Sequence, residues 1–107
     1  MTSNRLDRLD KLHQLLARTP DDPFLLYAIA LEHKKAGDLA DAVRQLRLTL
    51  QKDPAYIAAY LQMGQTQVLA GDVAAARQAF TDGIAAARKK GDHHAASEME
   101  QMLGMLR

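Results

Sequence analysis

Apolar residues recur every three to four positions along most of this chain, with polar residues between them. Such spacing gathers the apolar side chains on one face of an α-helix, and no stretch shows the period-two alternation of a β-strand. The pattern therefore predicts an all-α fold. With proline and glycine as boundaries, we expect about six helices, at 4–18, from Pro23 to Gly37, at 39–52, from Ile57 to Gly71, at 73–90 and at 93–106.

Three Gly-Asp pairs punctuate the chain, at Gly37-Asp38, Gly71-Asp72 and Gly91-Asp92. We expect each glycine to adopt the left-handed conformation that ends a helix, and each aspartate to cap the helix that follows. Connections this short make neighbouring helices antiparallel. The sequence therefore predicts helical hairpins.

The chain also contains a repeat, because Pro23–Tyr56 and Ile57–Lys90 align at a shift of 34 positions. The shift places Ala42 on Ala76 and Leu46 on Phe80. A fixed period of this length is typical of a supersecondary unit that buries its apolar face only by stacking on a neighbour. We therefore expect two equivalent hairpins, side by side.

The spacing within each unit resembles the tetratricopeptide repeat, whose pattern runs W-x₂-L-G-x₂-Y, then A-x₃-F, then P. The first unit reads Leu26-x₂-Ile29-Ala30-x₂-His33, Ala42-x₃-Leu46 and Pro54, and the second reads Tyr60-x₂-Met63-Gly64-x₂-Gln67, Ala76-x₃-Phe80 and Arg88. This resemblance covers nearly the whole chain. It implies antiparallel hairpins stacked in a right-handed superhelix, with small residues where helix axes approach closely.

In the frame of this resemblance the chain is one domain, 1–107, with a half repeat at 4–18, full repeats at 23–56 and 57–90, and a capping helix at 92–106. Arg8 falls where the full repeats have a small alanine, and we attribute this to the absence of a partner helix on that side. Ala95, Met99, Met102, Leu103 and Leu106 share one face of the last helix. We expect Met99, Met102 and Met105 to contact the core, with a pliable binding strip as the alternative.

The resemblance implies a scaffold that binds another protein, with a partner peptide or helix held on the concave face by the first helix of each repeat. On that face we expect Phe24, Tyr27, Leu31 and Lys34 from the first repeat and Ala58, Leu61, Gln65 and Val68 from the second. The alternative is that the terminal helices fold over these residues and make them ordinary core. One subtype of the family grips a C-terminal carboxylate with lysine and asparagine, but the matching positions here hold Tyr27, Leu31, Leu61 and Gln65, so that clamp is not expected.

Charge and composition narrow the function further. Fourteen Lys and Arg against thirteen Asp and Glu leave a net charge of +1, so no strong field draws the chain to nucleic acid. Cysteine is absent, which excludes disulfides and thiolate metal sites. No stretch is apolar enough for a signal peptide or a membrane span, and we expect a cytoplasmic protein without membrane contact.

The sequence offers few residues in arrangements suited to catalysis. The six glycines form no phosphate-binding loop. His93, His94 and Glu98 lie close in sequence, but no third ligand on the same face accompanies His94 and Glu98. We expect no enzyme activity and no cofactor or metal site.

Two other functions stay open at this point. The first helix carries Leu6, Leu9, Leu12, Leu15 and Leu16 along one stripe, which could pair with a second copy in a homodimer. A metal or small-molecule site is the less favoured alternative.

Overall fold

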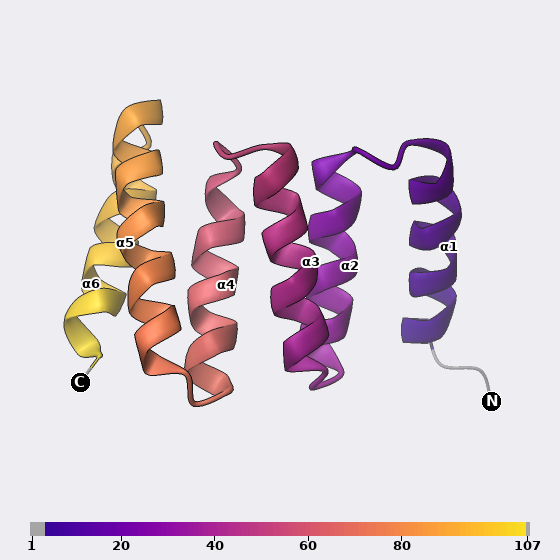
Figure 1. Ribbon diagram of the computed structural model, residues 1–107, viewed down its shortest axis with the longest axis horizontal. Helices are drawn as coiled ribbons and strands as arrows, with labels where there is room; N and C mark the ends of the chain where they lie inside the picture. Colours follow the sequence, from indigo (N-terminus) through magenta and orange to yellow (C-terminus); the bar gives the residue numbers. More distant parts are fainter. Residues whose placement is uncertain (1–3, 107) are drawn as a thin grey trace.

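The computed structural model of the protein describes residues 4–106. Within that range the chain forms six helices and no strand: α1 (Asn4–Arg18), α2 (Pro23–Lys35), α3 (Leu39–Lys52), α4 (Ile57–Leu69), α5 (Val73–Lys90) and α6 (His93–Met105). They stand side by side in a stack of 42 × 27 × 19 Å (Figure 1). The all-α class and the six helices are confirmed. The predicted domain limits at 1 and 107 lie outside the described residues.

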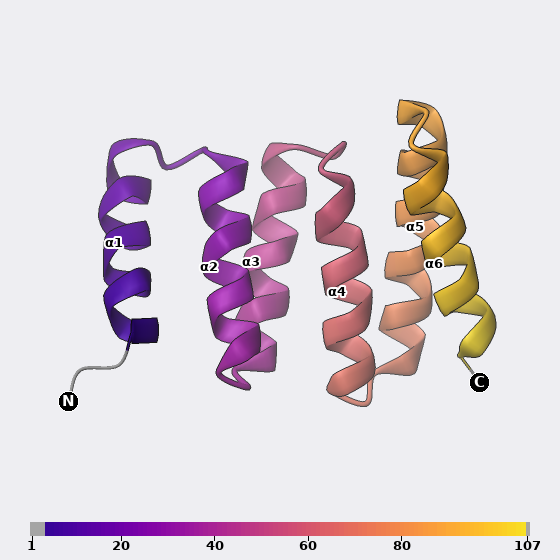
Figure 2. The same cartoon turned by 180° about the vertical axis from the view of Figure 1, so that it is seen from behind.

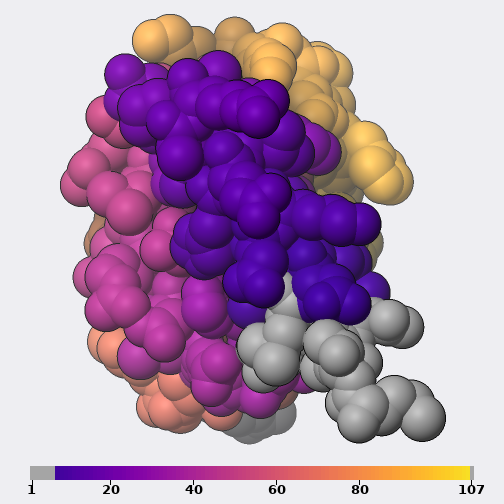
Figure 3. All heavy atoms as spheres, turned by 90° about the vertical axis from the view of Figure 1, so that its right-hand side faces the viewer, coloured from indigo at the N-terminus to yellow at the C-terminus, as the bar shows by residue number. Residues whose placement is uncertain are grey.

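The helices form two layers. In Figure 1 helices α3 and α5 lie nearer the viewer, whereas Figure 2, from behind, brings α2, α4 and α6 to the front. Helices α2 and α3 form one hairpin, α4 and α5 form the next, and α3 packs on α4 between them. Helix α1 packs on α2 at one end of the stack (Figure 3), and α6 packs on α5 at the other end and also reaches α4.

Short turns at the three glycines produce this antiparallel order. Each glycine has a positive φ of 80 to 82°, as predicted. The Asp72 and Asp92 carboxylates accept hydrogen bonds from the amides of Ala75 and Ala95, at 3.2 and 3.1 Å. Asp38 was predicted to do the same, and this is wrong: its side chain makes no capping bond.

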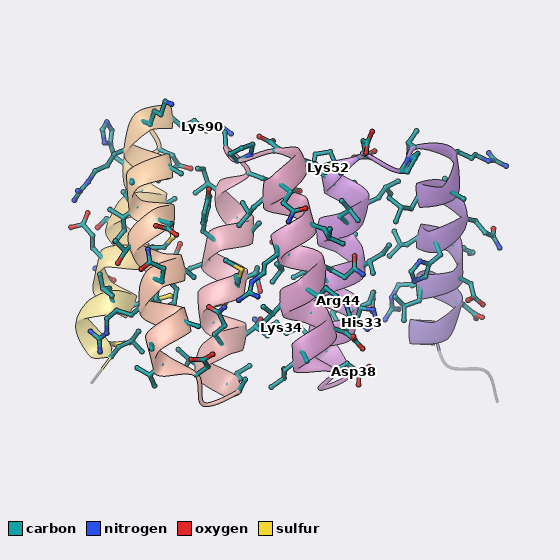
Figure 4. All side chains as sticks on the ribbon, viewed as in Figure 1. His33, Lys34, Asp38, Arg44, Lys52 and Lys90 are labelled. Atoms are coloured by element: carbon teal, nitrogen blue, oxygen red, sulfur yellow. The ribbon has the colours of Figure 1, made fainter. Side chains whose placement is uncertain are left out.

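The reason lies at the end of the preceding helix. The Asp38 carboxylate lies 3.7 Å from Nδ1 of His33, which is half-buried in the last turn of α2 (Figure 4). Gln67 occupies the corresponding position in the second hairpin, so Asp72 has no imidazole beside it and caps α5 instead.

Close packing inside each hairpin depends on complementary sizes. Phe80 of α5 is 1% exposed and lies directly against Gly64 of α4, where an added Cβ would be 2.4 Å from the ring. In the first hairpin Ala30 and Leu46 take the places of Gly64 and Phe80, and the two share one buried cluster. The predicted close approach of the helix axes is therefore present, and a smaller residue on one helix matches a larger one on the other.

Arg8 does not follow the sequence interpretation. We expected it to face a side with no partner helix, but its guanidinium turns to α2, where Nε lies 2.5 Å and Nη2 3.3 Å from the two carboxylate oxygens of Glu32. Glu32 is buried. A buried carboxylate needs a charged or hydrogen-bonding partner, and Arg8 is long enough to supply one from the neighbouring helix. The position is therefore used for an ion pair that fastens α1 to α2.

Helix α5 has 18 residues against 14 in α3, the extra turn predicted from Arg88 in place of proline. This turn gives α6 more surface to pack on, and Arg88 also binds Glu100 of α6 at 2.7 Å. The last helix is thereby fixed against α5 and α4.

Candidate binding groove

The eight residues predicted to line a groove lie on α2 and α4, in the layer that is in front in Figure 2. We call the outer surface of α2, α4 and α6 the groove face. None of the eight is buried: Phe24, Ala58 and Val68 are exposed, and Tyr27, Leu31, Lys34, Leu61 and Gln65 are half-buried. The terminal helices therefore leave much of this face open.

Two of the eight also pack inside the molecule. The ring of Tyr27 lies 5.0 Å from that of Tyr56, at the start of α4, and packs on the buried cluster around Leu46. Leu61 packs on the second cluster, together with residues of α6. These two side chains therefore also stabilise contacts between neighbouring helices.

Burial changes the acidity of several side chains at these contacts. It raises the pKa of Tyr27, an effect that a hydrogen bond with Gln62 partly offsets. Burial likewise raises the pKa values of Tyr56 and Tyr60, because the charged phenolate loses its hydration. The Tyr60 hydroxyl donates a hydrogen bond to the carbonyl of Pro54 at 2.8 Å.

A polar bridge crosses the groove face from α2 to α6. The Lys34 ammonium donates to Oε1 of Gln62 at 2.8 Å and, more weakly, to Oε1 of Gln65 at 3.4 Å. Gln65 Nε2 in turn lies 3.8 Å from the sulfur of Met102. Burial lowers the pKa of Lys34, because the ammonium exchanges water for amide oxygens and apolar neighbours. Figure 4 shows Lys34 near the lower end of α2.

Beside this bridge lies a pocket of about 500 Å³, which we call the α4–α6 pocket. Its lining is apolar apart from two side chains, and consists of Lys34, Gln65, Val68, Leu69, Phe80, Met102, Met105 and Leu106. Leu69 and Met105 at its mouth are 65% and 75% exposed. A cavity of this volume, mostly apolar with few polar groups, has the character of a ligand or side-chain binding site.

Three of these lining residues, Lys34, Gln65 and Val68, are among the predicted groove residues, whereas for the methionines of α6 the sequence favoured the core over a binding strip. We expected Met99, Met102 and Met105 all to contact the core. Met99 is fully buried and Met102 packs partly on the core, but Met105 is exposed at the mouth of the pocket. The three-residue spacing of these methionines was the available signal, since at 100° per residue each step turns the side chain farther round the helix.

Metal-binding groups are sparse. No cluster of three His, Cys, Asp or Glu side chains suited to a metal ion occurs in residues 4–106. His93 and His94 are exposed in the first turn of α6. No helix in the described part of the chain has both the length and the apolar character to cross a membrane.

Comparison with known proteins identifies the fold. A family model described as tetratricopeptide repeat matches residues 33–99. The TPR repeat-containing protein PA0015 of Pseudomonas aeruginosa is 34% identical over 98 residues, which cover 92% of this chain and 93% of the relative. The chain belongs to the tetratricopeptide repeat family.

Solved structures with a similar fold agree with this assignment. Protein BPP2914 from Bordetella parapertussis is 30% identical with a TM-score of 0.79, over 96% of this chain and 86% of that chain. The TPR2B domain of yeast Sti1, solved in a complex with pHsp70, gives a TM-score of 0.87 over 94% of this chain and 80% of that chain. At 17% identity the yeast domain shows the shared fold alone. The tetratricopeptide repeat fold generally serves as a protein interaction module.

Proposed function

We propose that this tetratricopeptide repeat protein is an adaptor without catalytic activity, and that it binds a peptide or helix of another protein on its groove face. The observation that carries this proposal is the α4–α6 pocket, with exposed apolar residues at its mouth. Exposed apolar residues that gather round a cavity are typical of interaction sites, whereas single ones are normal on any surface.

The packing of the repeats explains why this face suits a partner. In each hairpin the closely packed pair, Ala30 with Leu46 or Gly64 with Phe80, lies between the hairpin's own two helices, so most of the outer side of α2 and α4 is not needed for the core. Tyr27 and Leu61 hold the two helices in place, which leaves Phe24 and Val68 accessible on either side. A rigid, partly apolar surface of this kind binds a partner without first having to be ordered.

Homodimerisation through α1 is the second candidate function, and it has an observation of its own. Leu15 is 48% exposed, and Leu12 and Leu16 are half-buried. The side chain of Leu6 lies outside the described residues. Light scattering over a range of concentrations tests this candidate, because a stable dimer doubles the apparent mass and Leu15→Glu should abolish the dimer.

Matched variants separate the two surfaces. Val68→Glu places a charge on the groove face, and Leu15→Glu places the same charge at an exposed leucine of α1. We expect both to keep the helical circular dichroism of the wild type, because both side chains are exposed. In affinity capture from the native host, partners bound by the wild type should persist with Leu15→Glu and disappear with Val68→Glu. The opposite result would contradict binding on the groove face.

The predicted division into a half repeat, two full repeats and a capping helix stays our interpretation of the six helices. A cytoplasmic location stays a prediction of the sequence.

A further inference from the structure

The described residues that line the α4–α6 pocket carry positive charge and no negative charge. Helix α4, at the centre of the groove face, contains no Asp, Glu, Lys or Arg. Among the described residues that line the pocket, Lys34 is the only charged one. Glu98 lies one turn before Met102 on α6 and does not line the pocket. Within the described lining, a partner that enters the pocket therefore meets one positive charge in apolar surroundings.

Lys34 is also incompletely neutralised. Its ammonium group has three donors, and the two acceptors around it are neutral amide oxygens of Gln62 and Gln65. In the described part of the chain it forms no ion pair with a carboxylate, although five other Lys and Arg side chains do. Burial disfavours its charged form, as the lowered pKa shows. A carboxylate brought to this point would recover the lost stabilisation of the cation.

The apolar part of the pocket complements this charge. Phe80 lies at its inner side, while Leu69 and Met105 are exposed at its mouth. Methionine side chains adjust to different partners, because they are unbranched and flexible. Because Lys34 lines the same pocket, an apolar side chain bound there carries a neighbouring acidic residue to within reach of the ammonium.

We infer that the α4–α6 pocket receives an acidic amphipathic segment of a partner protein, with one large apolar side chain in the pocket and an adjacent side-chain carboxylate paired with Lys34. This inference rests on the proposed function, since it specifies the chemistry of the peptide that the groove face would bind. It differs from the family's grip on a C-terminal carboxylate, because the acid belongs to a side chain and the lysine stands at a different position of the repeat.

Three capped helical peptides test the inference against the full-length chain. They share a leucine- and alanine-rich sequence and differ only in carrying glutamate, glutamine or lysine beside the leucines. Both ends are blocked, so no terminal carboxylate contributes. In amide NMR titrations we expect the glutamate peptide to shift the signals of Val68, Leu69 and Met105. Its affinity should exceed that of the glutamine peptide about tenfold, as for one charge-assisted contact, and the lysine peptide should bind most weakly.

Two lysine variants with the same change in net charge give the control. Lys34→Met should remove the preference for glutamate and keep the weaker apolar binding. Lys35→Met should keep the preference, because Lys35 is exposed and lies 3.9 Å from Glu32. Equal binding of all three peptides, or an equal loss with both variants, would overturn the acidic preference and leave the groove itself standing. If no peptide shifted the groove signals, the proposed function would fail as well.

The last part of the experiment tests whether the pocket instead binds a small apolar carboxylate. Octanoate has the same chemistry without a peptide backbone. If octanoate shifted the pocket signals at lower concentration than the glutamate peptide, the pocket would be a small-molecule site and the inference of a protein segment would be wrong. Weaker binding of octanoate supports the protein segment.

Discussion

Replacing Gly64 by alanine tests the packing that holds the second hairpin together. The new Cβ would lie 2.4 Å from the Phe80 ring, whose neighbouring atoms are at 2.6 and 2.7 Å. Ordinary carbon contacts are about 3.5–4.0 Å, so the ring or the helix must move by more than about 1 Å. Phe80 is 1% exposed and lines the inner side of the α4–α6 pocket, so a retreat of the ring would also disturb that pocket.

The size of the effect follows from two opposing contributions. Forcing a methyl group into a well-packed core costs about 1–3 kcal/mol. Alanine in place of glycine inside a helix regains about 1 kcal/mol. Because the contact is with a buried ring and not with a flexible side-chain end, we expect the upper part of the first range. The net loss in the free energy of unfolding should be about 1–2 kcal/mol, a fall in Tm of about 4–8 °C per kcal/mol.

Gly104 is the matched control. It lies in the last turn of α6, and an added Cβ would meet nothing within 4 Å. Gly104→Ala should therefore be neutral or stabilising by up to about 1 kcal/mol. Urea unfolding followed by circular dichroism measures both variants. If Gly64→Ala were as stable as Gly104→Ala, the close contact between α4 and α5 would not exist as described.

The first hairpin suggests a second substitution that should restore part of the stability lost by Gly64→Ala. It has Ala30 and Leu46 at the positions of Gly64 and Phe80. Phe80→Leu should lose stability alone, yet combined with Gly64→Ala it recreates the pair used in the first repeat. We expect the double variant to be more stable than the sum of the single effects, by about 0.5–3 kcal/mol for residues in contact. Strict additivity would show that the two positions do not share this space.

Three further results are expected. Asp72→Ala should cost about 0.5–2 kcal/mol in urea unfolding, because it loses a helix cap, whereas Asp38→Ala should cost less, since Asp38 makes no capping bond. Arg8→Ala should speed hydrogen exchange of the α1 amides, because the ion pair that joins α1 to Glu32 of α2 is lost. Lys11→Ala changes an exposed side chain of the same helix and should leave the exchange unchanged. Equal exchange in the two variants would refute the role of the ion pair. Tyr27, Tyr56 and Tyr60 have raised pKa values, so folding favours their neutral form. Their absorbance should therefore titrate above the usual pH of about 10, and the free energy of unfolding should fall as the pH rises through that range. A titration midpoint at the usual value would contradict their burial.

Helical spacing alone explains which of the predicted groove residues share a face, while the groove itself stays a proposal. Phe24, Tyr27, Leu31 and Lys34 share a face because they are three or four residues apart on one helix, and the repeat places their counterparts on the same side of α4. Spacing could not show that Tyr27 stacks on Tyr56, because the partner belongs to another helix. It also could not show which residues of α6 border the pocket.

Local signals in the sequence determined the six helices, the turns at the three glycines, the longer α5 and the family of the fold. These features depend on backbone conformation and on neighbours within a few positions, which the residue types themselves specify. Only the tertiary structure decided that Arg8 pairs with Glu32, that Asp38 turns to His33, and that Lys34 and α6 together enclose a pocket with Met105 at its mouth. Such contacts join residues far apart in the chain, or depend on how a long side chain turns. They follow from the angle and depth at which helices pack, and hydrophobic periodicity leaves both of these open.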